Sequence, residues 1–250
     1  MKLYDFGTGP NKFLNRHCFE ISAFAAGGDL LSVSDFSKKY SPEFIEQVVS
    51  SIHRGISHLH EGKIYHCDLK PQNVFFLDEE QATAVIGDYG SAKSFDKAFA
   101  RELNYTTLTK GTDFYLAPEQ AFGIVSGKND YYSLGMIVLH LLYPQYANRQ
   151  NLRRIFERRT KGLPIVDFDK NYARINSLIE GLTLQDYNRR WGGKEVSRWL
   201  DGLEVPVNYG RSKLKRSLRI GDANFGSGRE LSEYIEGGKP FFEALIEDRE

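Results

Sequence analysis

Three short segments that combine acidic residues with glycine or proline follow one another along this chain, and we call them the polar segments. In order, they are Tyr65-His66-Cys67-Asp68-Leu69-Lys70-Pro71-Gln72-Asn73, Ile86-Gly87-Asp88-Tyr89-Gly90 and Gly111-Thr112-Asp113-Phe114-Tyr115-Leu116-Ala117-Pro118-Glu119. Each segment alone is a weak signal, because Asp, Asn and Gly also occur in ordinary loop caps. All three in this order and at this spacing form a strong signal, and the fold has to accommodate them together.

The composition is typical of a globular protein with an ample core. Of the 250 residues, 41% are hydrophobic and 13% are aromatic, which argues against disorder. Lys and Arg number 33 and Asp and Glu also number 33, so the formal net charge is zero. Proteins that bind nucleic acid over their whole surface are usually far more basic, so the charge argues against that class.

The sequence predicts neither a membrane span nor a secretory signal. The longest apolar run, Leu134–Tyr143, is interrupted by His140 and is far shorter than the roughly 20 residues that a span needs. Met1–Gly9 lacks the apolar stretch of a signal peptide. Cys18 and Cys67 are the two cysteines of the sequence, too few for a disulfide framework. We therefore expect a cytoplasmic protein.

Periodicity divides the chain into a short β region and a longer helical one. Met1–Phe6 and Phe19–Phe24 are predicted strands, with the Gly-Thr-Gly-Pro-Asn between them as a loop. Asp29–Tyr40 is a predicted short helix. Ser41-Pro42 has the N-cap and first-turn proline of a second helix. The buried face of that helix is predicted from apolar residues at helical spacing: Phe44, Ile45, Val48, Val49, Ile52, Ile56 and Leu59.

The second half of the chain begins with a hydrophobic helix, predicted over about Tyr131–Tyr143. A more polar helical region follows, to about Leu203. Beyond Glu204 the composition changes. Basic residues crowd Arg211–Arg219, which we interpret as a solvated linker rather than a surface for an acidic partner or nucleic acid. Gly228–Glu250 carries apolar residues at loosely helical spacing.

Together the three polar segments resemble the catalytic loop, the metal-binding Asp-Phe-Gly segment and the Ala-Pro-Glu segment of protein kinases. Asp130–Gly135 resembles the segment that opens the family's buried central helix, and Asp186–Arg190 resembles its late arginine segment. The resemblance covers about Phe19–Leu203. It implies an α+β, protein-kinase-like fold, with a mostly α-helical C-lobe preceded by a short β-hairpin and hinge.

The resemblance also implies roles for individual residues. Asp68 corresponds to the residue that accepts the proton of the substrate hydroxyl, and Lys70 to the lysine that contacts the γ-phosphate of ATP in Ser/Thr kinases. Asn73 and Asp88 match the two Mg²⁺ ligands, whose oxygen donors suit that ion. Thr112 occupies the position whose hydroxyl supports the catalytic Asp and Lys. The expected reaction transfers phosphate to a Ser or Thr hydroxyl of a protein substrate.

The segment Phe19–Leu30 resembles the last N-lobe strand, the hinge and the first turn after it, although a plain core hairpin stays an alternative. The resemblance implies five ATP contacts. Ser22 corresponds to the gatekeeper, and the backbones of Ala23 and Ala25 face the adenine edge. Asp29 lies near the ribose, and Phe75 forms the floor of the adenine pocket.

Two further residue sets have implied structural roles. Asp130 is expected to hold the backbone of the catalytic loop by hydrogen bonds. Glu119 and Arg190 are expected to form a buried ion pair, whose loss would cost about 3–5 kcal/mol of stability.

On this register, residues 1–18 leave no room for the glycine-rich strands, the strand lysine or the helix with its paired glutamate. Gly7–Lys12 has a superficial likeness to a phosphate loop but lacks its third glycine and following valine, so a turn between two strands is the preferred interpretation. Because the lysine–glutamate pair positions the ATP phosphates, we expect poor transfer by this chain alone and an N-lobe sequence upstream of it. A degenerate gene product is equally open.

The predicted organisation has three parts. Residues 1–29 are expected to be a remnant of the N-lobe with the hinge, and residues 30–203 the C-lobe. Residues 204–250 form a C-terminal extension to which the sequence assigns no role.

Two positions depart from the family pattern. Cys67 replaces the arginine that usually receives a phosphorylated activation loop, and Tyr89 replaces the Phe of Asp-Phe-Gly, where we expect similar packing. Four hydroxyl residues of that loop are interpreted as solvated polar positions rather than phosphorylation sites: Tyr105, Thr106, Thr107 and Thr109.

Three other functions stay open. A silent pseudokinase scaffold would explain the missing N-lobe motifs, but the intact set of Asp68, Lys70, Asn73 and Asp88 speaks against it. A small-molecule phosphotransferase of the aminoglycoside type shares the Asp-x-x-x-x-Asn loop, whereas the Ala-Pro-Glu segment favours a protein substrate. A zinc site lacks the usual spaced ligand pairs; its ligands would be His58, His60, His66 and Cys67.

Overall fold

A computed structural model of the chain describes most of its residues, in blocks separated by short gaps. The described residues are 3–9, 17–34, 38–78, 83–94, 114–147, 151, 154–155, 157–158, 163–209, 213–220 and 223–227. No helix within these ranges is long and apolar enough to cross a membrane.

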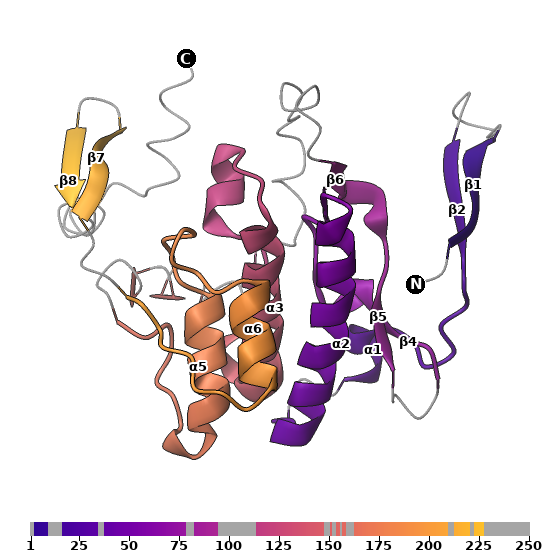
Figure 1. Cartoon of the computed structure of the whole chain (residues 1–250), viewed down its shortest axis with the longest axis horizontal. Coiled ribbons are helices and arrows are strands. Elements are labelled where there is room, and N and C mark those ends of the chain that lie inside the picture. The colour runs from indigo at the N-terminus through magenta and orange to yellow at the C-terminus, as the bar shows by residue number, and fades with distance from the viewer. Residues whose placement is uncertain are drawn as a thin grey trace.

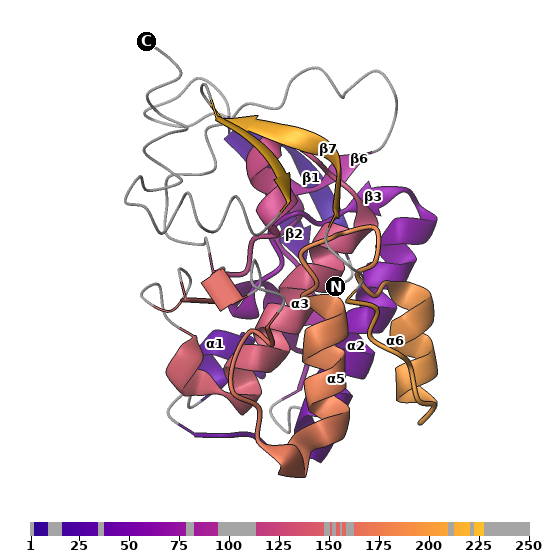
Figure 2. The ribbon, with the colours of Figure 1, turned by 90° about the vertical axis from the view of Figure 1, so that its left-hand side faces the viewer.

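Helices form the body of the molecule, and α3 lies at its centre (Figures 1 and 2). The principal helices are α2 (Pro42–Glu61), α3 (Gly127–Leu142), α5 (Ala173–Leu182) and α6 (Gly193–Leu200). α3 packs against α2 on one side and α5 on the other, and α6 contacts α2. Short 3₁₀ helices occur at η1 (Pro71–Asn73), η2 (Tyr89–Ser91), η4 (Pro118–Phe122), η5 (Pro144–Tyr146) and η6 (Lys170–Tyr172).

The start and the buried face of α2 are confirmed. The backbone N–H of Phe44 donates to Ser41 Oγ at 3.3 Å, and Pro42 occupies the first turn. The apolar residues at helical spacing point into the core: Ile45, Val48, Val49, Ile52 and Ile56 are fully buried, and Phe44 and Leu59 are partly buried against them. Their burial removes an entire helix face from water, at about 1.5–3 kcal/mol for each large side chain.

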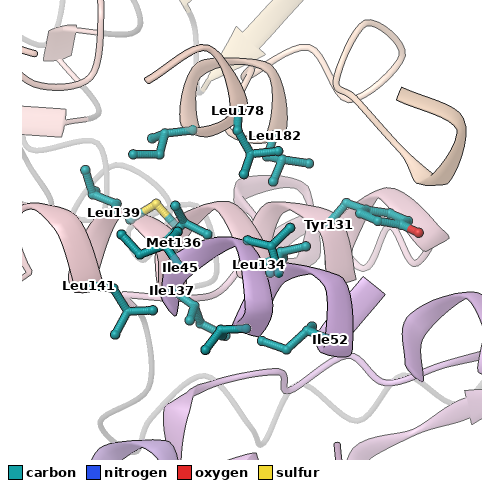
Figure 3. Packing of buried hydrophobic residues seen from close by; sticks show 14 of the residues in the cluster. Ile45, Ile52, Tyr131, Leu134, Met136, Ile137, Leu139, Leu141, Leu178 and Leu182 are labelled. Atoms are coloured by element: carbon teal, nitrogen blue, oxygen red, sulfur yellow. The ribbon is translucent and has the colours of Figure 1, made fainter. Parts of the chain in front are cut away.

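α3 is buried almost all round, and it begins earlier than the sequence predicted. Ser126 caps its first turn by accepting the N–H of Lys128 at 3.3 Å. The predicted start at Tyr131 was wrong, because it followed the apolar residues alone. The preceding turn also belongs to the helix, and its polar residues Asn129 and Asp130 are fully buried. Figure 3 shows Leu134 and Ile137 among apolar side chains of the neighbouring helices: Ile45 and Ile52 of α2 and Leu178 and Leu182 of α5.

The expected hairpin precedes the helices. Its strands β1 (Leu3–Gly9) and β2 (His17–Ser22) pair antiparallel, which confirms the predicted β-hairpin. β1 continues through Gly9, which lies opposite His17, so the prediction of a loop from Gly7 to Gly9 was wrong. The same pairing disfavours Gly7–Lys12 as a phosphate loop, because its first three residues belong to a strand ladder.

Two small ladders lie next to α2 and support the loops between them. β3 (Ile64–Tyr65) pairs antiparallel with β6 (Lys93–Ser94), and β4 (Val74–Phe76) with β5 (Ala84–Ile86). The first and last residues of each strand, Val74 and Phe76 in β4 and Ala84 and Ile86 in β5, join the core, and the middle residue of each strand is partly buried.

The helix predicted over Asp29–Tyr40 is shorter than expected. α1 spans only Leu30–Val33, with Asp29 as its N-cap, and Ser34 is already extended at φ −90° and ψ 127°. Val33 and the serines around it are weak helix formers, which explains the early end.

The interpretation of Arg211–Arg219 as a linker was wrong. Residues 213–220 form strand β7 (Lys213–Ile220), which pairs antiparallel with β8 (Ala223–Ser227). The predicted helical segment Gly228–Glu250 lies outside the described residues. Between α6 and β7, Val205 is buried and the indole Nε1 of Trp191 donates to the Pro206 carbonyl at 3.3 Å.

A buried ion pair joins the Ala-Pro-Glu segment to the end of the helical body, as predicted. Both guanidinium NH groups of Arg190 donate to Glu119, one of them over 2.9 Å. Arg190 is 1% exposed and Glu119 is 6% exposed. Further bonds satisfy the pair: Asn129 Nδ2 donates to Glu119 at 2.8 Å, and Arg190 Nε donates to the Leu184 carbonyl at 2.9 Å. A buried pair is tolerated only with such complete pairing.

A partly buried contact lies where the same segment meets α3. Tyr115 Oη is 2.6 Å from His140 Nδ1, and the Phe114 ring packs edge-on against the imidazole. Burial lowers the pKa of His140 to about 4, so the ring is neutral at pH 7. Burial also lowers the pKa of His53, and the nearby charge of His60 adds to the effect.

Replacing Arg190 by Leu leaves the Glu119 carboxylate buried without its main partner. We expect the free energy of unfolding to fall by about 3–5 kcal/mol. The control is Arg154→Leu, because Arg154 lies 3.8 Å from Asp167 in an exposed pair and its loss should cost less than about 1 kcal/mol. Urea unfolding followed by circular dichroism measures both changes, and equal losses in the two variants would contradict this account.

The neutral ring of His140 predicts a pH dependence of stability. Its folded-state pKa lies below the unfolded value of 6.5, so the unfolded chain binds a proton first as the pH falls. The stability that the neutral ring contributes is fully present above pH 6.5 and is lost as the pH falls from 6.5 to 4. The loss is about 1 kcal/mol once solvent screening is allowed for. Urea unfolding at pH 7 and at pH 5 measures the effect. The free energy of unfolding should change less between the two pH values in His140→Gln than in the wild type. His58→Gln, at an exposed position of α2, serves as the control; an unchanged difference in His140→Gln would refute the assignment.

Candidate active site

The loop from His66 to Asn73 is held by the side chain of Asp130, which lies in the first turn of α3. The two oxygens of this fully buried carboxylate accept the backbone N–H groups of His66 and Cys67, each at 2.9 Å. His60 Nε2, at the end of α2, lies 2.8 Å from Asp130 Oδ2 and donates to it, because a carboxylate only accepts. The predicted role of Asp130 as the anchor of this loop is confirmed.

Cys67 turns the chain sharply just before Asp68. Its φ of 65° is in the left-handed region, which a residue other than glycine adopts only when its surroundings enforce it. Burial and, secondarily, the charge of Asp130 raise the pKa of the thiol to about 12. The thiol is therefore protonated at neutral pH and is a weak nucleophile.

Three of the predicted catalytic residues converge beyond this turn. Lys70 Nζ lies 2.6 Å from Asp68 Oδ2, and both side chains are partly exposed. Asn73 Nδ2 donates to the Asp68 carbonyl at 2.8 Å, which fixes the carboxamide from the far end of the loop. The loop thus presents a carboxylate and an ammonium group at the surface over a fixed, 3% exposed carboxamide.

His66 ties this loop to the segment that carries Asp88. Its ring Nε2 donates to the Gly87 carbonyl at 3.0 Å, which leaves Nδ1 as the acceptor for the Asp68 N–H at 3.4 Å. In return, the Gly87 N–H donates to the Asn73 carbonyl at 2.9 Å. Asn73 and Asp88 therefore emerge from adjacent ends of the β4–β5 ladder, as a shared ligand set requires.

Asp88 is exposed and lies in the left-handed region at φ 59°. Its Oδ1 accepts the N–H of Gly90 at 3.3 Å. Behind it, Tyr89 packs its ring against His66 and donates its hydroxyl to the Ile86 carbonyl at 2.8 Å. Tyr89 therefore packs under the site, and its hydroxyl makes a hydrogen bond that a Phe in its place would lack.

The donor set of Asn73 and Asp88 fits Mg²⁺. Both supply hard oxygen ligands, and the amide nitrogen of Asn73 is engaged by Asp68, so its oxygen is the atom available to a cation. The zinc alternative has no such support: among the described residues no group of three or more His, Cys, Asp or Glu side chains is arranged to hold a metal. His60 and His66 use Nε2 for Asp130 and Gly87 instead.

The segment predicted to be the hinge is joined to β4. Gly27 N–H donates to the Phe76 carbonyl at 3.0 Å, and Phe76 N–H donates to the Gly28 carbonyl at 2.8 Å. An isolated bridge then pairs Asp29 with Phe75. The structure thus brings together the two residues predicted to lie near the ribose and below the adenine.

The remaining predicted ATP contacts are less completely described. The Ala25 carbonyl accepts the N–H of Gly28 at 3.2 Å. Asp29 Oδ1 accepts two N–H groups of α1 as its N-cap. Ala23 lies in the irregular stretch after β2, and Ser22 ends that strand. Thr112 and the four hydroxyl residues of the activation loop lie outside the described residues.

Sequence reasoning missed His60 as a support of the site, because it weighed this residue only as a metal ligand. Its bond to Asp130 joins residues 70 positions apart, which no local periodicity reveals. The one available signal was the placement of a histidine in the last turn of an amphipathic helix, directly before the polar loop.

Comparisons with known proteins agree with this geometry. The family model described as "Protein kinase domain" matches residues 2–199. The chain is 26% identical over 239 residues to a calcium/calmodulin-dependent protein kinase of Metarhizium anisopliae, covering 88% of this chain and 60% of that protein. It is 35% identical over 120 residues to the G-type lectin S-receptor-like serine/threonine-protein kinase SD2-2 of Arabidopsis thaliana, covering 44% of this chain and 14% of that protein.

A third relative is the serine/threonine-protein kinase mig-15 of Caenorhabditis elegans, 27% identical over 157 residues, covering 59% of this chain and 14% of that protein. The chain thus spans 60% or less of the length of each of these relatives. The family match covers the whole helical body and all three polar segments. With the catalytic-loop geometry and the Glu119–Arg190 pair, it establishes that the chain belongs to the protein kinase domain family.

Proposed function

We propose that this chain carries the phosphoryl-transfer site of a Ser/Thr protein kinase, which moves the γ-phosphate of ATP to a protein hydroxyl in a Mg²⁺-dependent reaction. The observation that carries the proposal is the convergence of Asp68 and Lys70 beside Asn73, which the β4–β5 ladder links to Asp88. Protein kinases as a family use ATP with a divalent metal and act on proteins.

In the proposed reaction Asp68 acts on the nucleophile. Its carboxylate is partly exposed, and it accepts the proton of a Ser or Thr hydroxyl as the hydroxyl oxygen forms its bond to the γ-phosphorus. The bond from that phosphorus to the bridging oxygen of ADP breaks at the same time. Lys70 lies 2.6 Å from the carboxylate and supplies positive charge next to the transferring group.

Asn73 and Asp88 would hold the metal. Bound Mg²⁺ neutralises charge on the phosphate oxygens. The chain's own contribution is to fix the two oxygen ligands: Asn73 through its bond to the Asp68 carbonyl, and Asp88 through the bond between Gly87 and Asn73. Asp29 and Phe75, paired next to the hinge, are the proposed neighbours of the nucleoside, and Ser22, Ala23 and Ala25 are its further proposed contacts. The hydroxyl of Thr112 is proposed to support Asp68 and Lys70.

The preference for Ser and Thr rests on Lys70, which stands at the lysine position of Ser/Thr kinases. The printed names of two relatives, the kinases SD2-2 and mig-15, describe serine/threonine-protein kinases and support the same choice. The sequence contains no match to the glycine-rich phosphate loop or to the strand lysine of the family, which position the ATP phosphates. We therefore also propose that efficient transfer needs these two elements in addition to this chain. A silent scaffold is the alternative that the test must separate.

Replacing Asp68 by Asn removes the proposed proton acceptor with little change in shape. We expect phosphate transfer to fall by about 10²–10⁴-fold, because that is the usual contribution of a general base. Transfer from labelled ATP with Mg²⁺ to a generic basic protein is measured for this chain and for the same chain with a protein-kinase N-lobe fused before Met1. EDTA should abolish the transfer, and excess Mg²⁺ should restore it.

The matched control is Asp201→Asn, an exposed position directly after α6, which should transfer at the wild-type rate. Transfer that survives in Asp68→Asn would overturn the assigned role of this residue. No transfer by either wild-type chain would favour the scaffold.

A further inference from the structure

Gln120 links two segments that lie far apart in the sequence. It lies in η4, directly after the Ala-Pro-Glu segment. Its Oε1 accepts the N–H of Ala117 at 3.0 Å, and its Nε2 donates to the Cys67 carbonyl at 3.0 Å. A backbone N–H only donates and a carbonyl only accepts, so these two partners determine the orientation of the carboxamide.

The Cys67 carbonyl belongs to the peptide bond that leads directly to Asp68. Cys67 is the left-handed residue of the loop, and its N–H is already bound by Asp130 at 2.9 Å. Asp130 therefore holds the amino side of this residue and Gln120 holds its carbonyl side. A strained conformation persists only where such contacts enforce it.

The segment that carries Gln120 is itself fixed in the core. The preceding residue, Glu119, is bound by Arg190 and Asn129 in the core. Asp130 therefore links the loop to α3, and Gln120 links it independently to the Ala-Pro-Glu segment. A reactive group supported in this way keeps its geometry, since each supporting side chain is locked by its own partners.

We infer that Gln120 is a positioning residue, which sets the direction of Asp68 through the Cys67–Asp68 peptide. The inference rests on the proposed phosphoryl transfer and deepens it. Misplacement of a catalytic group by about 1 Å can lower the rate about 10²-fold. Loss of Gln120 should therefore lower kcat, because Asp68 acts in the chemical step. The KM for ATP should change little, since Gln120 touches neither the hinge nor the β4–β5 ladder in any described contact.

Two substitutions separate the bonds of Gln120. Gln120→Glu keeps an acceptor for the Ala117 N–H but has no donor for the Cys67 carbonyl, whereas Gln120→Met fills a similar volume and loses both bonds. The control is Gln145→Met, exposed on η5 at the other end of α3, about 24 Å along the helix. Hydrogen–deuterium exchange of residues 64–74 is measured for each chain, together with kcat, KM and the melting temperature.

We expect both Gln120 variants to exchange about tenfold faster within residues 64–74, since one hydrogen bond contributes roughly that factor. Exchange in α5 should not change, kcat should fall by about tenfold or more, and KM for ATP should stay within about twofold. Wild-type exchange in residues 64–74 of both variants would overturn the inference. Faster exchange across the whole domain would also overturn it, because it would reveal a general structural role. If neither wild-type chain transfers phosphate, the proposed function fails, and the exchange measurement still decides whether Gln120 holds the loop.

Discussion

A single buried carboxylate organises the site. Asp130 is fully buried, a costly position for a charge unless its oxygens are hydrogen-bonded. Both oxygens accept bonds, from the N–H groups of His66 and Cys67 and from the ring of His60, so the cost of burial is offset by charge-assisted hydrogen bonds. Those bonds hold the loop in the conformation that places Asp68 and Lys70 together. The helix that carries Asp130 is therefore both the centre of the core and the support of the chemistry.

The rest of the helical body keeps that support rigid. α3 packs between α2 and α5, and the Glu119–Arg190 pair binds the Ala-Pro-Glu segment to the residues before α6. A mobile site would lose the alignment that phosphoryl transfer needs, because the reaction depends on positioning and charge more than on covalent chemistry. The left-handed conformations at Cys67 and Asp88 occur where these rigid supports meet the exposed site.

Much of this architecture was predictable from the sequence because it is local or belongs to a recognisable motif. The cap at Ser41 and the apolar face of α2 follow from spacing within one helix, and the partnership of Glu119 with Arg190 follows from the family resemblance. The early start of α3 was not predictable from hydrophobicity, since its first turn buries polar residues. Strand β7 was missed because its many basic residues were interpreted as a linker. Leu214, Leu218 and Ile220 nevertheless stand at positions two or four apart, the spacing of residues on one face of a strand. Contacts such as Gln120 to Cys67 join residues 53 positions apart and leave no periodic signal.

The most direct test of this account is amide hydrogen exchange in Asp130→Asn, which replaces one acceptor oxygen of the buried carboxylate by a donor. We predict that the amides of His66 and Cys67 exchange at least about tenfold faster than in the wild type, while those of α5 keep their protection. Unchanged exchange at His66 and Cys67 would show that the loop holds its shape without this carboxylate. That result would contradict the central claim that Asp130 organises the site.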